Sequence, residues 1–468
     1  MADLALLNDD RDHTEIREDL LRYVKKDDHV FVVLDDDPTG TQTVHDVRVY
    51  TDWSYASMKE AFQNEKLFYL LTNSRAMSAK ESRRIHEEIC AVISRVSKET
   101  GKKYFYISRG DSTLRGHYPM ETDILAEGLR KDIGHIDGDI LIPYFKEGGR
   151  FTINDIHYVR YGDRLVPAAE TEFAKDKTFG YHSSDLKEYI EEKSEGKIRK
   201  EDVISISLDD IRKQLGVKIF GLLCEAKNQK KIIVNAATDD DVRYFCRCLY
   251  QAISTDKTFV FRSAASFVKC VGGISDQGLL NKEEMIQEAN PNGGIIVVGS
   301  HTEKTTRQLN ELLKLDGLVP LEFRCSTILE SREAFEKEIS RLLLKEEEIL
   351  SSGRTAVIYT ERLLISLEDD DKEKALARSV AISDGVCRFI SELKIKPSFV
   401  LAKGGITSAD VAVKGLNIRK AKVLGQIQPG VPVWQAESDS RFPHIPYVIF
   451  PGNVGDDETL KNAALRLL

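Results

Sequence analysis

The chain has 468 residues, a formal net charge of −9, 41% apolar residues and 31% charged residues. This length exceeds one ordinary hydrophobic core, so we expect two domains. The negative charge gives no general attraction to nucleic acid or to an anionic membrane, although local basic pockets can still bind small anions. No apolar stretch approaches the roughly 20 residues that span a bilayer, and the acidic N-terminus lacks a cationic, apolar leader. We therefore expect a cytoplasmic protein without a nucleic-acid or membrane partner.

The cysteines and histidines show no metal-binding spacing. Seven cysteines are scattered without a CxxC pair, and the ten histidines include no HExxH motif. This pattern favours reduced, mostly buried thiols over disulfides, and it predicts no dedicated metal site.

The first two-thirds of the chain alternate short apolar runs with amphipathic, charged stretches. This alternation predicts βαβ units around a largely parallel sheet. Helices are expected over 79–99 and 239–253, and the charged, irregular segment 183–218 is interpreted as a peripheral helical excursion. The expected strands are 30–34, 47–51, 67–72, 104–108, 140–142, 231–235 and 258–262.

A change of composition predicts the domain boundary. Residues 271–293 break the rhythm with glycine, asparagine, proline and charge. We expect an N-terminal domain over 1–272, a linker over 273–293 and a C-terminal domain over 294–468. The fold class is therefore α/β, with two domains that each hold a largely parallel sheet flanked by helices. The strands expected in the second domain are 295–299, 319–323, 355–360, 399–402, 422–427 and 447–450.

An acidic turn follows the first strand. In FVVLDDDPTG, residues 31–40, an apolar run ends at Asp35–Asp37 and then opens into a glycine-containing turn. Ligands bind at this edge of open α/β sheets, and clustered carboxylates are costly unless a cation or a proton relay needs them. The alternative is a solvated acidic turn. We favour a plain structural role for two other acidic runs, with Asp239–Asp241 starting a helix and Asp369–Asp371 in an exposed loop.

Two further strand ends in this domain carry polar groups. Residues 109–117 read RGDSTLRGH, and residues 71–75 read LTNSR. Guanidinium and hydroxyl groups suit a small, polyhydroxylated acid. The alternative is that Asp111 and Ser112 cap a helix while Arg75 and Arg115 form surface ion pairs. His117 is assigned a lesser role, and Arg150 is interpreted either as another anion contact or as a loop-fixing residue.

Three strands of the second domain end in similar turns. They run into 300–306 (SHTEKTT), 403–410 (KGGITSAD) and 451–457 (PGNVGDD). Glycines let backbone N–H groups approach a ligand, and helix N-termini favour negative charge. No GxGxxG motif is present, and the stretch from Gly299 to Thr305 only imitates a P-loop. Together the turns predict a nucleotide phosphate site of another class.

Taken in order, these strings resemble the four-carbon acid sugar kinase family from about residue 30 onward. The matching segments are Asp36-Asp37-Pro38-Thr39-Gly40, Ser74-Arg75, Asp111-Ser112-Thr113-Leu114-Arg115-Gly116, Gly299-Ser300, Gly404-Gly405-Ile406-Thr407-Ser408, Pro429-Gly430-Val431-Pro432 and Gly452-Asn453-Val454-Gly455. The chain departs from the family at His117, where asparagine is usual, at Ile406, where an acidic residue is common, and at Pro451.

The resemblance implies an ATP-dependent kinase that phosphorylates the terminal hydroxyl of a four-carbon sugar acid such as threonate, erythronate or 3-oxo-tetronate. It places the active site in the cleft between the two domains, with ATP and Mg²⁺ as cofactors, and by analogy we expect a homodimer. Asp36 or Asp37 is expected to orient the hydroxyl and accept its proton, with Asp111 as the second candidate. Arg75 and Arg115 are expected to hold the carboxylate. The implied substrate-binding residues are Ser74, Arg75, Asp111, Ser112, Thr113, Arg115 and Gly116, and the implied nucleotide-binding residues are Ser300, Lys403, Gly404, Gly405, Thr407, Gly452, Asn453, Val454 and Gly455.

Two other functions stay open at this point. One is a sugar-acid dehydrogenase or aldolase on a similar fold, against which the missing dinucleotide motif and the missing metal-ligand histidines argue. The other is a catalytically silent nucleotide or metabolite sensor, which the departure at Ile406 leaves open.

Overall fold

The computed structural model describes residues 4–362, 372–452 and 454–468. The chain divides into two compact units, Met1–Asp276 and Gln277–Leu468, and the division falls within the segment predicted as the linker. Two sequence predictions, the exposed loop at Asp369–Asp371 and the nucleotide contact at Asn453, lie outside the described residues. In the described part of the chain, no helix has the length and apolar character needed to cross a bilayer.

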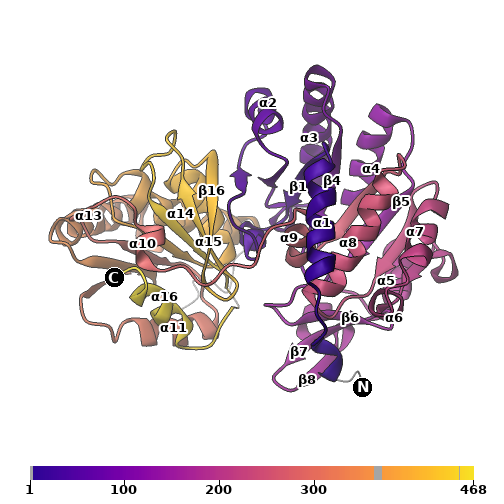
Figure 1. Ribbon diagram of the computed structural model, residues 1–468. Coiled ribbons are helices and arrows are strands. Elements are labelled where there is room, and N and C mark those ends of the chain that lie inside the picture. Colours follow the sequence, from indigo (N-terminus) through magenta and orange to yellow (C-terminus); the bar gives the residue numbers. More distant parts are fainter. Residues whose placement is uncertain (1–3, 363–371, 453) are drawn as a thin grey trace. The chain divides into compact units, whose positions relative to one another are not determined.

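The first unit is built on a parallel sheet with the strand order β2-β3-β1-β4-β11-β5-β10-β9. Figure 1 labels β1, β4 and β5 of this sheet. Its central strands are buried along their full length, which explains why they read as continuous apolar runs. The bounds are β1 Val30–Asp35, β2 Arg48–Tyr50, β3 Leu67–Leu71, β4 Tyr104–Arg109, β5 Gly138–Ile142, β9 Ile204–Ile206, β10 Lys230–Val234 and β11 Phe259–Ser263.

Helices cover this sheet in two packed groups. One group joins α2, α3 and α4, and the other joins α1, α7 and α8. Right-handed crossovers between parallel strands place the two groups on opposite faces. A capping box between Thr238 and Asp241 begins α8, so the prediction that Asp239–Asp241 starts a helix is confirmed. The bounds are α1 Thr14–Lys26, α2 Tyr55–Asn64, α3 Ala79–Thr100, α4 Met120–Ile133, α5 Leu186–Lys193, α6 Leu208–Arg212, α7 Gly216–Glu225, α8 Asp239–Ile253 and α9 Ala265–Val271.

Two features of the first unit differ from the prediction. A separate antiparallel sheet, β6 Arg150–Ile153, β7 Ile156–Tyr161 and β8 Arg164–Pro167, was not predicted. The interpretation of 183–218 as a peripheral helical excursion holds for α5 and α6, but it missed β9, which lies within the segment and pairs in parallel with β10. A strand of three residues is too short to show a period of two, so it is hidden among the charged residues around it.

The second unit has the strand order β13-β14-β12-β15-β18-β17-β16. The strands β13, β14, β12, β15 and β18 are parallel, and β17 and β16 join them as an antiparallel hairpin. The strand bounds are β12 Ile295–Val298, β13 Leu318–Phe323, β14 Thr355–Thr360, β15 Val400–Lys403, β16 Lys420–Gln428, β17 Val431–Ala436 and β18 Pro446–Phe450. The helix bounds are α10 Lys282–Met285, α11 Glu303–Leu312, α12 Thr327–Glu330, α13 Arg332–Ser351, α14 Lys372–Ser391, α15 Gly405–Asp410 and α16 Thr459–Leu465.

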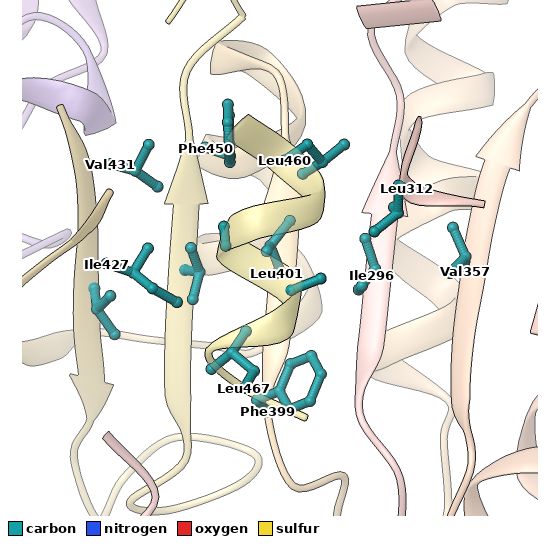
Figure 2. Packing of buried hydrophobic residues seen from close by; sticks show 14 of the residues in the cluster. Ile296, Leu312, Val357, Phe399, Leu401, Ile427, Val431, Phe450, Leu460 and Leu467 are labelled. Carbon is teal, nitrogen blue, oxygen red and sulfur yellow. The ribbon is translucent and has the colours of Figure 1, made fainter. Parts of the chain in front are cut away.

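The core of the second unit lies between its sheet and the helices α11 and α16. Figure 2 shows Leu460 at the level of Phe450 and Leu467 beside Phe399, with the C-terminal helix in front of the strands. The same cluster contains Leu280 and Met285, so part of the segment predicted as linker packs into this core. This packing fixes the strands whose ends form the glycine-containing turns.

A buried glutamate in the second unit gives a stability prediction. Glu346 of α13 is fully buried, and among the described residues neither of its carboxylate oxygens has a hydrogen-bond partner. Burial raises the pKa of Glu346 well above its ordinary value, whereas the unfolded chain ionises it near pH 4.3. Below the unfolded pKa the buried group is protonated in both states and costs no ionisation energy. The free energy of unfolding therefore falls as the pH rises from the unfolded pKa toward the folded pKa. Glu346→Met is expected to raise the free energy of unfolding by about 1–3 kcal/mol at pH 7.5, and by less at pH 5.

Urea denaturation at the two pH values measures this effect. The matched control is Glu348→Met, an exposed position on the same helix, which is expected to change stability little. An unchanged or lower free energy of unfolding for Glu346→Met at pH 7.5 contradicts the prediction.

Candidate functional site

The polar strand ends of the first unit come together at one edge of its sheet. Strands β3, β1 and β4 are parallel neighbours, so their carboxyl ends lie side by side. This places Asp35–Asp37 between the turn that carries Arg75 and the loop that carries Asp111 and Arg115. The juxtaposition expected from the sequence is therefore present.

Arg75 connects the acidic turn to the loop after β4. Its guanidinium forms an ion pair with Asp37, and Nη1 lies 3.3 Å from Asp111 Oδ1 and 3.8 Å from Asp36 Oδ1. Asp111 in turn accepts from Arg115 Nε at 2.8 Å. Asp37 and Arg115 are thus members of one charged network.

The guanidinium groups keep two of these carboxylates ionised. Burial acts to raise the pKa of Asp37, but Arg75 and the hydrogen bonds from Thr39 hold it below its ordinary value. Burial acts in the same way on Asp111, where Arg75 and Arg115 hold the pKa far below the usual range. Thr113, itself buried, donates its hydroxyl to Asp111. Asp37 and Asp111 are therefore ionised at neutral pH, and the two arginines balance their charge.

Two further carboxylates lie deeper. Arg109 Nη1 lies 3.2 Å from Asp35 Oδ1 and 3.6 Å from Asp36 Oδ1. Burial raises the pKa of Asp35 to about 8, and it also raises the pKa of Asp36. Within the described residues, neither carboxylate oxygen of Asp36 has a hydrogen-bond partner. Gly40 packs on Asp35, because a Cβ at that position would overlap the carboxylate.

A buried ion pair that sequence reasoning missed supports the same loop. Arg262 Nη1 donates at 2.9 Å to both Glu121 Oε2 and Ser108 Oγ, and the Ser74 hydroxyl donates to Glu121 Oε1 at 2.7 Å. The Arg262 guanidinium also fills the space that a side chain would need at Gly116. Ser74 and Gly116 therefore contact the buried Glu121–Arg262 ion pair that supports the loop. The available signal was an arginine inside an apolar strand, VFRS of β11, which is rare without a buried partner.

Two histidines fix the loops around the network. His157 of β7 donates from Nε2 to the Ser112 carbonyl at 2.8 Å and accepts from the Thr152 hydroxyl at 3.0 Å. Burial lowers the pKa of His157 to about 4, so the ring is neutral. His117 donates from Nε2 to the backbone carbonyls of Ser74 and Met77 at 3.2 and 3.1 Å. His157 thereby ties the antiparallel sheet to the Asp111 loop.

The second unit contains a cavity of about 370 Å³ at the carboxyl ends of its parallel strands. One side is formed by the polar turns after β12, β15 and β18. The rest of the lining mixes polar and apolar residues and includes Ile382 and Val386 of α14. The residues from the turns are Gly299, Ser300, His301, Gly404, Gly405, Ile406, Thr407 and Gly452, and the other lining residues are Cys325, Thr360, Arg378, Ser379, Ile382, Ser383 and Val386.

The turns around the cavity need their small residues. Gly404 has φ +120°, a conformation that favours glycine, and it precedes α15. A Cβ on Gly299 would overlap the hydroxyl of Thr407. Arg362, which the sequence analysis missed, donates from Nη2 to the Ser300 carbonyl at 2.6 Å and so fixes the turn after β12.

Side chains from β15 and α11 hold the turn after β18 by hydrogen bonds to its backbone carbonyls. Lys403 is fully buried and donates from Nζ to the carbonyls of Pro451 and Gly452 at 2.6 and 3.0 Å. Burial lowers the pKa of Lys403 to about 7. Gln308 and Lys304 of α11 donate to the carbonyls of Val454 and Gly455 at 3.1 and 3.0 Å. Lys403, Val454 and Gly455 therefore shape this turn.

Family models match both units of the chain. A sugar-binding N-terminal domain matches residues 31–271, and a nucleotide-binding C-terminal domain matches residues 295–460. No curated protein sequence matches the chain.

Two solved structures share the fold. A "putative tRNA synthase" from Salmonella typhimurium LT2 has a TM-score of 0.67 at 15% identity, covering 92% of this chain and 98% of its own. A Haemophilus influenzae protein of family DUF1537 has a TM-score of 0.62 at 15% identity, covering 94% of this chain and 100% of its own. At this identity the similarity shows the fold alone.

Proposed function

Because the chain belongs to the four-carbon acid sugar kinase family, also called DUF1537, we propose that it transfers the γ-phosphoryl group of ATP to the terminal hydroxyl of a four-carbon sugar acid. The chain carries the sugar-binding and the nucleotide-binding domain of that family. The observation that supports the proposal most is the charged network that Arg75 forms with Asp37 and Asp111 at the strand ends of the sugar-binding domain.

The cavity of the second unit suits a nucleotide. Its volume falls within the range of small-molecule sites. The turns containing Ser300, Gly404–Gly405 and Gly452 offer hydroxyls and closely approachable backbone to phosphates. The side with Ile382 and Val386 offers an apolar surface to a base. We assign the phosphates to the turns and the adenine to α14.

In the first unit we assign the attacking hydroxyl to Asp37. Phosphoryl transfer depends on positioning and charge neutralisation more than on covalent help. Asp37 is ionised and partly exposed, so it can orient a hydroxyl and accept its proton. Asp36, which is more deeply buried, is the second candidate because its oxygens have unused hydrogen-bonding capacity. Ser112 and Thr113 are assigned to ordering the substrate hydroxyls.

Mg²⁺ would accompany ATP and neutralise charge on its phosphates. This ion is usually held through substrate phosphates and water with only one or two protein ligands. The Ser300 and Thr302 hydroxyls, 3.4 Å apart at the turn before α11, are oxygen donors of the kind that Mg²⁺ accepts. Phosphoryl transfer also requires that the bound ATP and the bound sugar acid meet. The active-site cleft between the two domains stays a prediction.

Measurement of ADP release tests the proposed function. The purified chain is incubated with Mg²⁺ and ATP, with and without threonate, erythronate or 3-oxo-tetronate in turn. We expect ADP release that depends on at least one of these acids, because a kinase site leaves ATP intact until the acceptor is bound.

The two alternatives give different results in the same experiment. Saturable ATP binding without ADP release from any acid indicates a sensor. A change in NADH absorbance with a sugar acid, without ADP release, indicates a dehydrogenase. Either result contradicts the proposed function.

A further inference from the structure

The arginines of the sugar-binding network already have carboxylate partners from the chain itself. Arg75 is paired with Asp37 and Asp111, and Arg115 lies 2.8 Å from Asp111 and 3.6 Å from Asp176. The hypothesis that Arg75 and Arg115 alone hold the substrate carboxylate therefore leaves the substrate competing with these partners. A site for an external anion is better served by a cation that still has an unpartnered donor.

Arg150, the first residue of β6, is such a cation. Its Nε is buried and has no hydrogen-bond partner among the described residues. Burial lowers the pKa of Arg150, and its nearest charges do not reverse this effect. For Arg75 and Arg115, burial acts in the same direction, but their carboxylate partners raise the pKa above the ordinary value. Among the described residues, no carboxylate therefore fully offsets the burial of the Arg150 charge, as the carboxylates beside Arg75 and Arg115 do for theirs.

Arg150 is held beside the network by its neighbours. Its backbone exchanges hydrogen bonds with Phe145 at 2.8 and 3.1 Å. Its guanidinium carbon lies 5.5 Å from the centre of the Phe173 ring, and the guanidinium carbon of Arg115 lies 5.1 Å from the same centre. Two guanidinium groups thus share one aromatic ring, where their like charges oppose each other. An anion beside them relieves this repulsion and gives the unpartnered Arg150 Nε an acceptor.

We propose that Arg150 binds the carboxylate of the substrate and so makes the site specific for acids over neutral polyols. The proposal rests on the proposed function. Asp37 and Arg115 lie at opposite ends of the chain of contacts through Arg75 and Asp111, and Arg150 lies at the Arg115 end. A four-carbon sugar acid likewise carries its terminal hydroxyl and its carboxylate at opposite ends. With the terminal hydroxyl of the acid placed at Asp37, its carboxylate is therefore placed at Arg150.

Steady-state kinetics with the acid that supports ADP release test this assignment. For Arg150→Met we expect the KM for the acid to rise roughly 10- to 100-fold, with the KM for ATP changed less than about twofold. Arg150→Lys keeps the charge without the fork and is expected to fall between Met and wild type. Arg160→Met on β7 is the matched control, because the exposed Arg160 donates to the backbone of Gly162. It is expected to behave as wild type.

Chemical rescue adds a readout that a purely structural role does not give. Ethylguanidinium added to Arg150→Ala is expected to lower the KM for the acid, and it is expected to have no effect on Arg160→Ala. Calorimetric binding of erythronate and threonate to wild type and Arg150→Met gives the same comparison without turnover. Equal acid affinity for wild type and both Arg150→Met and Arg150→Lys overturns the assignment. If wild type binds an acid but releases no ADP, the proposed function fails while the role of Arg150 is still decided by binding.

Discussion

Asp37→Asn is expected to lower the turnover number of the protein with the sugar acid by about 10²- to 10⁴-fold and to leave the Kd for ATP nearly unchanged. Asparagine keeps the shape of the side chain, and its oxygen can still accept from Thr39, whose backbone N–H lies 2.8 Å from Asp37 Oδ1. What the variant loses is the ionised group that orients the attacking hydroxyl. Turnover by ADP release and ATP affinity by calorimetry measure the two quantities separately.

Two comparisons give this prediction its controls. Asp163→Asn, at an exposed position between β7 and β8, is expected to match wild type. Asp36→Asn distinguishes the two candidates for the base. If Asp37→Asn retains turnover within about threefold of wild type while Asp36→Asn loses it, Asp36 is the base and the assignment of Asp37 is wrong.

Ser300→Asp is expected to bind ATP at least about 30-fold more weakly than Ser300→Asn, a difference of about 2 kcal/mol. The two side chains have the same size, so they differ mainly in charge. Ser300 lines the cavity at the turn to which we assign the phosphates. Two like charges about 4 Å apart near a protein surface repel by about 4 kcal/mol, and salt reduces this value. Calorimetry with ATP measures the difference.

Adenosine is the control ligand for this pair of variants. It lacks phosphates, so its affinity is expected to be the same for Ser300→Asp and Ser300→Asn. If ATP also binds the two variants equally, the phosphates do not lie at the turn after β12. Loss of adenosine binding in Ser300→Asp alone indicates instead that the substitution distorts the cavity.

Most of the fold follows from local sequence patterns. The strands β1 and β14 are uninterrupted apolar or β-branched runs, and α8 carries both its capping box and a periodic apolar face, so their positions were predictable. The small antiparallel sheet was missed because β6 and β8 have only four residues each and β7 ends in exposed residues. Such elements depend on what packs against them more than on their own pattern.

The candidate sites divide in a similar way. Asp37, Arg75 and Asp111 were predictable because each directly follows a strand of one parallel sheet, and parallel strands end at the same edge. Glu121 and Arg262 were missed because one lies in a helix and the other at the end of a distant strand. Their pairing depends on the three-dimensional path of the chain. The sequence also could not show which arginines already have partners, and this information separates Arg150 from Arg75.

The central claim is that one phosphoryl group passes from ATP to a four-carbon sugar acid. Phosphorus-31 NMR of the wild-type protein with Mg²⁺, ATP and the acid panel tests it most directly. We predict one new phosphomonoester signal, equal in amount to the ADP formed, with little inorganic phosphate. Formation of ADP with only inorganic phosphate, or no loss of ATP with any of the acids, contradicts the account.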